Sequence, residues 1–280
     1  PADLFKAHKP QLALIPMEAT LAPPAIDAAL NAGCHVMAEK PACVRAEDFA
    51  PLVAKANAKN RHLMLALANR VDPLTRRARS LIAGGALGKI YGVEMQLIAD
   101  QTRLTRPAYH KTWVAQKSRA GGGYLIWLGI HWLDLAVHIT GSQIIQITGF
   151  TGNVGGQPLD TEDAAAVAVK FANGTFGTLT AGYYLDRSKQ DLLKIWGEKG
   201  WLEIHHDRPE DPFQWQIGSQ PVQHWKPTEP AGYTPWVQHV VRAAIGLEKP
   251  ILSPNESLQA LRVVFAGYRA AETGRTQVVF

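Results

Sequence analysis

Short apolar runs alternate with amphipathic stretches over residues 11–83. The apolar runs predict strands at 11–15, 34–38 and 62–68, and the stretches between them predict helices at 23–32, 46–60 and 73–83. Prolines open the helix at 23–32 and Gly33 follows it, which is the usual asymmetry of helix ends. Strands that alternate with helices in this way are typical of a parallel α/β sheet.

From Gly88 onward the hydrophobic pattern has the period of strands. It predicts strands at 90–99, 144–154, 164–171, 177–184, 191–196 and 201–204, with a hairpin turn at Asn173-Gly174. One helix at 123–139 interrupts these strands, and helices at 235–247 and 257–273 precede a last strand at 277–280. We therefore predict a mostly antiparallel open sheet backed by helices, an α+β unit that begins near residue 86.

Composition and charge exclude several classes of protein. The net charge of +5 comes from 29 basic and 24 acidic residues that are scattered, so we expect no nucleic-acid partner. No apolar run approaches the ~20 residues that span a bilayer, so we expect no membrane association. Two cysteines, Cys34 and Cys43, are too few for a disulfide framework, although they could pair with each other. A cytoplasmic location is the default expectation.

A charged pair, Glu39-Lys40, closes the apolar run at 34–38 and is followed by Pro41. An unpaired charge is costly to bury unless it faces a crevice or a ligand. In open α/β sheets that crevice lies outside the carboxyl ends of the strands. Lys40 is therefore predicted to be a functional lysine, with an exposed lysine past a strand end as the alternative.

The helix predicted at 123–139 follows three glycines, Gly121-Gly122-Gly123. Glycine permits close approach of the backbone, here either to a neighbouring strand or to a ligand. Residues spaced three or four apart share one helix face, and four polar or aromatic residues have this spacing: Trp127, His131, Asp134 and His138. The last three could form a metal set, but ligands at these spacings on one helix cannot easily converge on one ion, so we predict no metal site.

These segments together resemble the Gfo/Idh/MocA oxidoreductases, the family of glucose–fructose oxidoreductase and inositol dehydrogenase. The resemblance extends over essentially the whole chain and rests on Ala38-Glu39-Lys40-Pro41, on the glycine-led stretch from Gly121 to Asp134, and on the order of the elements, with Asn69-Arg70 before Pro73 and Ala86-Leu87-Gly88-Lys89-Ile90 at the entry to the second sheet. It implies that residues 1–85 are the C-terminal part of a Rossmann-type dinucleotide-binding domain and that residues 86–280 form a substrate and oligomerisation domain.

The resemblance also implies a chemistry. NAD or NADP would exchange a hydride with a sugar, a polyol or a related hydroxy-compound, with Lys40 and His131 as the catalytic pair. We expect Lys40 to polarise or deprotonate the substrate hydroxyl, with a pKa lowered by burial. The peptide bond before Pro41 is a candidate for the cis form, which would fix the direction of the lysine.

The remaining site residues follow from the same resemblance. Expected substrate contacts are Asp134, Trp127, Trp113 and Tyr109, with Trp127 as a stacking platform for a sugar ring. Expected cofactor contacts are Pro16, Glu39, Lys40, Asn69 and Arg70. For Asp134 the alternatives are a hydrogen bond that orients His131, a pair with an arginine, or a cap on a neighbouring segment. For His131 the alternative is a histidine satisfied in the core, and for Trp127 it is simple packing.

Two departures from the family pattern qualify these expectations. The strand–GxGxxG–helix unit that holds a pyrophosphate does not occur near the start, so we expect such residues upstream or a partner chain that completes the sheet. The family's aspartate four residues before the histidine is replaced by Trp127, which rules out a simple Lys-Asp-His triad. Two other functions therefore stay open: a non-catalytic binding or regulatory relative, or a fragment; and an enzyme that oxidises its substrate only transiently for hydrolysis or elimination at a sugar carbon.

The open face of the second sheet suggests a homo-oligomer. An uncovered apolar sheet face is a liability for a soluble chain, and we expect a second copy to cover it. The residues taken to form that face are Val167, Val169, Phe171, Leu179 and Tyr183.

Overall fold

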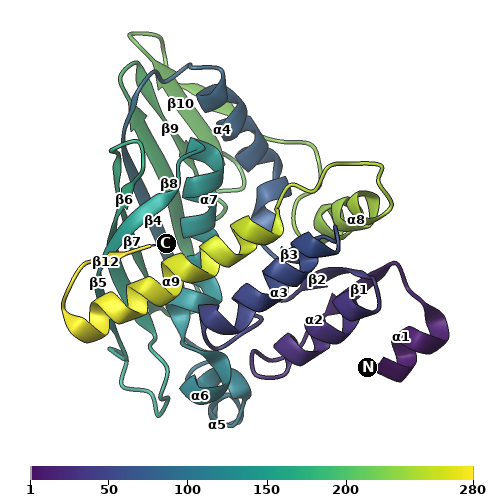
Figure 1. Cartoon of the computed structure of the whole chain (residues 1–280). Coiled ribbons are helices and arrows are strands. Elements are labelled where there is room, and N and C mark those ends of the chain that lie inside the picture. Colours follow the sequence, from purple (N-terminus) through teal and green to yellow (C-terminus); the bar gives the residue numbers. More distant parts are fainter. Residues whose placement is uncertain (1, 280) are drawn as a thin grey trace.

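The computed structural model describes residues 2–279 and contains two sheets (Figure 1). The smaller sheet has three parallel strands in the order β1 (Leu12–Ile15), β2 (His35–Ala38) and β3 (Leu63–Leu65). Helices α2 (Ala22–Asn31) and α3 (Ala46–Ala58) connect them, as the alternating pattern predicts. The parallel register brings the carboxyl ends of all three strands to one edge.

The larger sheet has nine strands in the order β11-β10-β9-β8-β4-β7-β6-β5-β12. Neighbours are antiparallel except β4 and β7, which run parallel. The strands are β4 (Ile90–Asp100), β5 (Ile144–Gly152), β6 (Ala164–Phe171), β7 (Phe176–Leu185), β8 (Gln190–Gly197), β9 (Gly200–Ile204), β10 (Phe213–Ile217), β11 (Gln223–Trp225) and β12 (Gln277–Val278). The fold is thus a Rossmann-type parallel sheet followed by a mostly antiparallel sheet, as predicted.

Three helices lie between the two sheets: α4 (Pro73–Ala83), α7 (Ile130–Thr140) and α9 (Pro254–Thr273) (Figure 1). Helix α9 contacts β5 of the larger sheet as well as α3 and β3 of the smaller unit, so it joins the two. Helix α8 (Tyr233–Ala244) lies beside the smaller sheet. The larger sheet therefore has one face covered by helices and one face open.

The residues expected on the open face lie on the covered face instead. Val167, Val169, Phe171, Leu179 and Tyr183 are all buried in the core beneath the helices. Side chains alternate across a strand, so the open face carries their neighbours, which are small or hydroxylated: Ala166, Ala168, Thr178 and Thr180. The expectation about these five residues was wrong because apolar strand residues first fill the core of their own chain.

Several elements differ from the sequence-based expectation. Helix α1 (Ala2–His8), strands β10 and β11, and the short helices α5 (Pro107–His110) and α6 (Lys117–Ala120) were not predicted. Strand β3 is shorter than predicted, and a 3₁₀ turn, η1 (Ala68–Val71), follows it. The predicted last strand extends to 280, which lies outside the described residues. The division of the chain at residue 86 stays a prediction.

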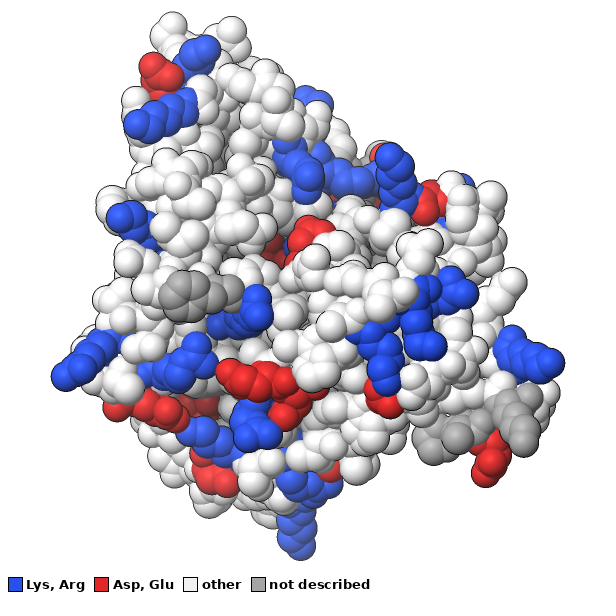
Figure 2. Space-filling model, viewed as in Figure 1, with Lys and Arg blue, Asp and Glu red and all other residues white. Residues whose placement is uncertain are grey.

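The surface agrees with the scattered charge of the sequence. Figure 2 shows Lys and Arg dispersed over the face in view, with acidic residues among them. Over residues 2–279, no helix combines the length and the apolar character that crossing a membrane requires. Both cysteines are buried free thiols, and the Sγ of Cys34 donates to the carbonyl oxygen of Pro10 at 3.0 Å.

Candidate active site

Lys40 lies two residues after the end of β2, with Glu39 between them, and is 8% exposed. Its Nζ lies 4.0 Å from the centre of the Trp127 ring and donates a hydrogen bond to the Trp127 carbonyl oxygen. Burial lowers the pKa of Lys40 to about 8, with the Arg103 charge acting in the same direction and Glu39 opposing it. The Lys40–Pro41 bond is cis, as expected. Lys40 is thus a buried amine that can exchange a proton near neutral pH.

The carbonyl that holds Lys40 belongs to a π-helical turn, η3 (Leu125–Gly129), which leads into α7. The backbone N–H of Ile130 donates to the Leu125 carbonyl, five residues earlier. A π turn pairs its backbone groups differently from an α-helix, and such turns occur frequently at functional sites. The sequence predicts one regular helix over 123–139, so this interruption is a finding of the structure.

His131 lies one residue into α7 and is half-buried. Its Nδ1 is closed off from solvent and has no hydrogen-bond partner in the part of the chain that the structure describes. Burial, together with the nearby Lys40 charge, lowers the pKa of His131 to about 3, so the ring is neutral at physiological pH. The alternative of a histidine satisfied in the core is therefore not what is found. A buried nitrogen without a partner beside a lysine is suited to hydrogen bonding with a ligand.

The three glycines are explained by contacts within the chain. A Cβ on Gly123 would lie 1.9 Å from the Glu162 carbonyl oxygen, and one on Gly122 would lie 2.2 Å from the Tyr268 hydroxyl oxygen. The Glu162 carboxylate accepts from the backbone N–H groups of Gly123 (2.6 Å) and Leu125 (2.9 Å) and from the Tyr268 hydroxyl (2.6 Å). Of the two alternatives for the glycines, close approach to a neighbouring segment is the one observed, and Glu162 fixes the start of the π turn.

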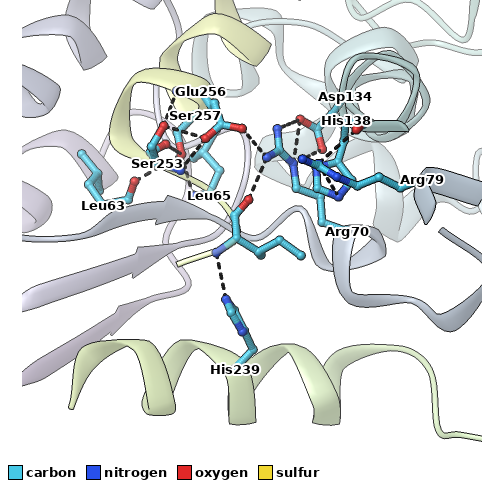
Figure 3. Close-up of polar contacts among 11 residues, drawn as sticks. Leu63, Leu65, Arg70, Arg79, Asp134, His138, His239, Ser253, Glu256 and Ser257 are labelled. Carbon is cyan, nitrogen blue, oxygen red and sulfur yellow. Dashed lines mark hydrogen bonds and ion pairs between the residues drawn. The ribbon is translucent and has the colours of Figure 1, made fainter. Parts of the chain in front are cut away.

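Asp134 and Arg70 form a buried ion pair (Figure 3). The Nε of Arg70 donates to Oδ2 of Asp134 at 2.9 Å, and Nη2 donates to Oδ1 at 2.7 Å. Burial raises the pKa of Asp134, and the Arg70 charge opposes that effect. The pairing of Asp134 with an arginine, left open by the sequence, is thus the arrangement found. No hydrogen bond to His131 is made by Asp134 within residues 2–279.

The other edge of Arg70 reaches the start of α9 (Figure 3). Its Nη1 donates to the Glu256 carboxylate at 2.6 Å and to the Ile251 carbonyl at 2.9 Å. Glu256 in turn forms a capping box with Ser253. Arg70 therefore joins η1, α7 and α9, and this network fixes α7 relative to the smaller sheet. The structure offers no support for the expected contacts of Arg70 with a cofactor and of Asp134 with a substrate.

His138 lies further along α7 and meets Arg79 of α4. Arg79 Nη1 donates to Nδ1 of His138 at 2.6 Å and to its carbonyl oxygen at 3.1 Å. Burial and the charges of Arg70 and Arg79 lower the pKa of His138 to about 3. The three residues weighed as a metal set have different surroundings, because Asp134 pairs with Arg70 while His138 accepts from Arg79.

The aromatic residues predicted at the site do come together. The Trp113 ring, in the 3₁₀ turn η2 (Trp113–Ala115), meets the Trp127 ring edge-on at 5.5 Å between centroids. Tyr109 of α5 and Trp127 line one recess, together with Tyr183 of β7. Trp127 stands where the resembled family has aspartate. It contacts Lys40 through its ring and its carbonyl oxygen, and it also lines the recess.

The expected cofactor residues follow the strand ends. Pro16 follows β1 and is exposed, Asn69 lies half-buried in η1, and Glu39 is half-buried and accepts from the Tyr233 hydroxyl. Their positions at the carboxyl edge of the sheet, beside Lys40, fit the nicotinamide side of a dinucleotide. The strand–GxGxxG–helix unit that holds a pyrophosphate does not occur within residues 2–279, so the described residues fit that side only.

Sequence reasoning missed two polar groups of the site, Arg103 and Glu162. A lone arginine in a loop and a lone glutamate before a strand carry no pattern, and only the tertiary contacts show their surroundings.

Two sequence models of one oxidoreductase family match the chain. Residues 1–67 match the model described as an oxidoreductase family with an NAD-binding Rossmann fold, and residues 75–203 match the model of the GFO/IDH/MocA C-terminal domain. The two matches follow each other without overlap. They correspond to the smaller sheet and to much of the larger one.

Two curated relatives have about a quarter of their aligned residues in common with this chain. Levoglucosan dehydrogenase of Pseudarthrobacter phenanthrenivorans is 27% identical over 206 residues, covering 66% of this chain and 52% of that protein. D-glucoside 3-dehydrogenase of Escherichia coli is 26% identical over 183 residues, covering 60% of this chain and 50% of that protein. The chain therefore spans about half the length of the curated relatives it matches.

A solved structure shares the fold. The oxidoreductase domain protein of Kribbella flavida superposes with a TM-score of 0.89 at 23% identity, covering 99% of this chain and 82% of that one. At this identity the similarity establishes the architecture. It agrees with a parallel sheet followed by a large mixed sheet.

Proposed function

The chain belongs to the Gfo/Idh/MocA oxidoreductase family, and we propose from this premise that it oxidises or reduces a carbohydrate-like hydroxy-compound by hydride exchange with NAD or NADP. The observation that carries the proposal is Lys40, a buried amine at a strand end with a pKa of about 8. Near it lies a neutral histidine whose Nδ1 has no hydrogen-bond partner among residues 2–279. The names of the two curated relatives, both sugar dehydrogenases, support a sugar or sugar derivative as substrate.

Lys40 has the role of acid and base. When the substrate carbon loses its hydride, its hydroxyl oxygen must lose a proton so that a carbonyl can form, and an amine with a pKa of about 8 can take that proton. The Trp127 carbonyl oxygen accepts from Nζ and so fixes it beside Trp127, a residue that lines the recess. In the reverse direction the protonated amine returns the proton to the oxygen.

His131 and the indole rings position the substrate. Because the pKa of His131 is lowered to about 3, the ring hydrogen bonds as a neutral group and does not itself carry the proton. Trp127 and Trp113 present aromatic surface on which the C–H face of a sugar ring can pack. NAD or NADP, when bound at the strand ends near Pro16 and Asn69, supplies the hydride acceptor.

The proposal is tested by following reduction of NAD and NADP with a panel of polyols and aldoses. We expect Lys40→Met to lower kcat/KM by about 10²–10⁴-fold, the usual contribution of a positioned acid or base. Lys59→Met, at an exposed lysine next to α3, is the matched control and should leave it unchanged. Activity that survives in Lys40→Met would overturn the proposal.

A second copy of the chain is the partner we propose for the open sheet face. Phe150 and Phe176 are 79% and 65% exposed there, on strands whose neighbouring outward residues are mostly alanine and threonine, with Lys170 opposite Phe176. The two free thiols fit a reducing compartment such as the cytoplasm. Light scattering of the purified chain tests the assembly, and a monomer at high concentration would refute it.

A further inference from the structure

The guanidinium of Arg103 lies near two tyrosine rings whose residues line the recess. Arg103 follows β4, and its Cζ is 4.7 Å from the centre of the Tyr183 ring and 5.4 Å from that of Tyr109. Both tyrosines line the recess that also contains Trp127. Contact with the ring faces stabilises the cation without using its N–H groups.

One edge of this guanidinium has no acceptor. Nε and Nη2 of Arg103 are both closed off from solvent and make no hydrogen bond or ion pair in the part of the chain that the structure describes. The hydroxyl of Tyr183 beside it is likewise buried without a partner. A buried polar group without a partner costs free energy, so the three together mark a place built for an acceptor.

Arg70 shows in the same molecule what that edge binds. Its Nε and Nη2 hold the Asp134 carboxylate side-on, at 2.9 and 2.7 Å. The planar edge of an arginine matches a carboxylate in this bidentate way, which a lysine cannot reproduce. Arg103 presents the same two nitrogens, and no carboxylate within residues 2–279 occupies them.

The position of Arg103 connects it to the catalytic lysine. Its charge is one of the causes that lower the pKa of Lys40, so the two cations are close enough to influence each other. Trp127 forms part of both surroundings, through its contact with Lys40 and as a wall of the recess. Trp127 thus connects the surroundings of Lys40 to the recess whose tyrosines contact Arg103.

We propose that the substrate is a sugar acid, or a related hydroxy-acid, whose carboxylate binds side-on to Nε and Nη2 of Arg103 and accepts from the Tyr183 hydroxyl. The inference rests on the proposed function, because it names the substrate class of the same site. It assigns Arg103 as a specificity-determining residue.

The test is a binding titration by calorimetry with matched ligands. D-glucuronate carries the carboxylate, its methyl ester and D-glucose lack the charge, and D-glucose 6-phosphate carries a phosphate instead. We expect D-glucuronate to bind about 10–100-fold more tightly than the ester or glucose, the value of a charge-assisted pair. Glucose 6-phosphate binding more tightly than glucuronate would overturn the assignment to a carboxylate.

Variants separate recognition from folding. Arg103→Met keeps the stem and should abolish the preference for glucuronate, and Arg103→Lys keeps the charge but should restore little of it. Arg106→Met, at an exposed arginine of the same segment, is the matched control and should leave the preference unchanged. Unfolding curves show whether the variants are folded, and if Arg103→Met does not fold, Arg103→Lys decides.

Failure of the inference and failure of the proposed function give different results. Reduction of NAD with neutral sugars, without a preference for glucuronate, would overturn the sugar-acid inference and leave the oxidoreductase intact. Binding of glucuronate that depends on Arg103, without reduction of NAD or NADP, would support the carboxylate site and count against the enzyme. Absence of glucuronate binding to the folded chain would overturn the inference outright.

Discussion

Replacing Asp134 by alanine removes the carboxylate from the buried pair with Arg70. Both side chains are almost fully buried, at 3% and 1% exposed, and the pair has short bidentate hydrogen bonds. Breaking a buried pair by removing one partner costs about 3–5 kcal/mol, because the remaining charge is left uncompensated. We expect Asp134→Ala to lose that much free energy of unfolding, and its Tm to fall by on the order of 10 °C.

A double-mutant cycle isolates the interaction. Arg70→Met, Asp134→Leu and the double variant are compared by urea unfolding with the unchanged chain. The double variant should be less destabilised than the sum of the two single variants, by about 2 kcal/mol, since neither buried charge remains. The exposed pair Arg45–Asp48, with side chains 71% and 28% exposed, is the internal control, and Arg45→Ala should cost less than about 1 kcal/mol.

The activity of these variants tests the role of the pair in positioning α7. Asp134→Asn keeps the shape of the side chain and one acceptor oxygen but removes the charge. If the weakened pair lets α7 shift His131, kcat should fall by a larger factor than KM rises. A cost below about 1 kcal/mol for Asp134→Ala, together with a cycle that shows no coupling, would refute the argument that this network fixes the site.

Three further outcomes are expected. The rate of substrate oxidation should rise with pH through an apparent pKa of about 8, that of Lys40, and a flat profile from pH 6 to pH 10 would contradict its role as base. Gly123→Ala should destabilise the chain by about 2–4 kcal/mol in thermal unfolding, because its Cβ would lie 1.9 Å from the Glu162 carbonyl oxygen. Gly152→Ala is the control and should cost little, because its Cβ meets nothing nearer than 3.9 Å. The free energy of unfolding should fall as pH drops from about 6.5 to 3, because unfolded chains protonate His138 in this range while the pKa of His138 in the folded chain is about 3. His138→Gln should reduce that loss by up to about 4 kcal/mol. An unchanged dependence of stability on acid pH would exclude this histidine as its source.

The parallel α/β part could be predicted closely from the sequence. Two of its helices, α2 and α4, have proline in the first turn, and its strands are short apolar runs, so local propensity and tertiary structure agree. The helix predicted at 123–139 was correct in position, but its first part is a π-helical turn and not a regular α-helix. The spacing of its apolar residues suits a regular helix, and the π turn depends on Glu162 and Lys40, which come from distant segments.

Partners of charged side chains could not be read from spacing. Asp134 lies on the same helix as His131 at a spacing that suits a shared site, yet the side chain that meets it is Arg70 of η1. For Arg103 the sequence contains no suggestive spacing at all. Its surroundings are formed by Tyr109 and by Tyr183 of β7, which are distant from each other in the chain. Charge and burial become interpretable only when the third dimension is known.

The measurement that tests the central claim most directly is a fluorescence titration of the chain with NADH and with NADPH. Eight tryptophans can transfer energy to the bound nicotinamide, and Trp127 lies against Lys40, at 4.0 Å from Nζ to the ring centre. The account predicts saturable transfer with one of the two cofactors, weaker binding in Lys40→Met and reduced transfer in Trp127→Phe. A folded chain that gives no saturable transfer with either cofactor would contradict it.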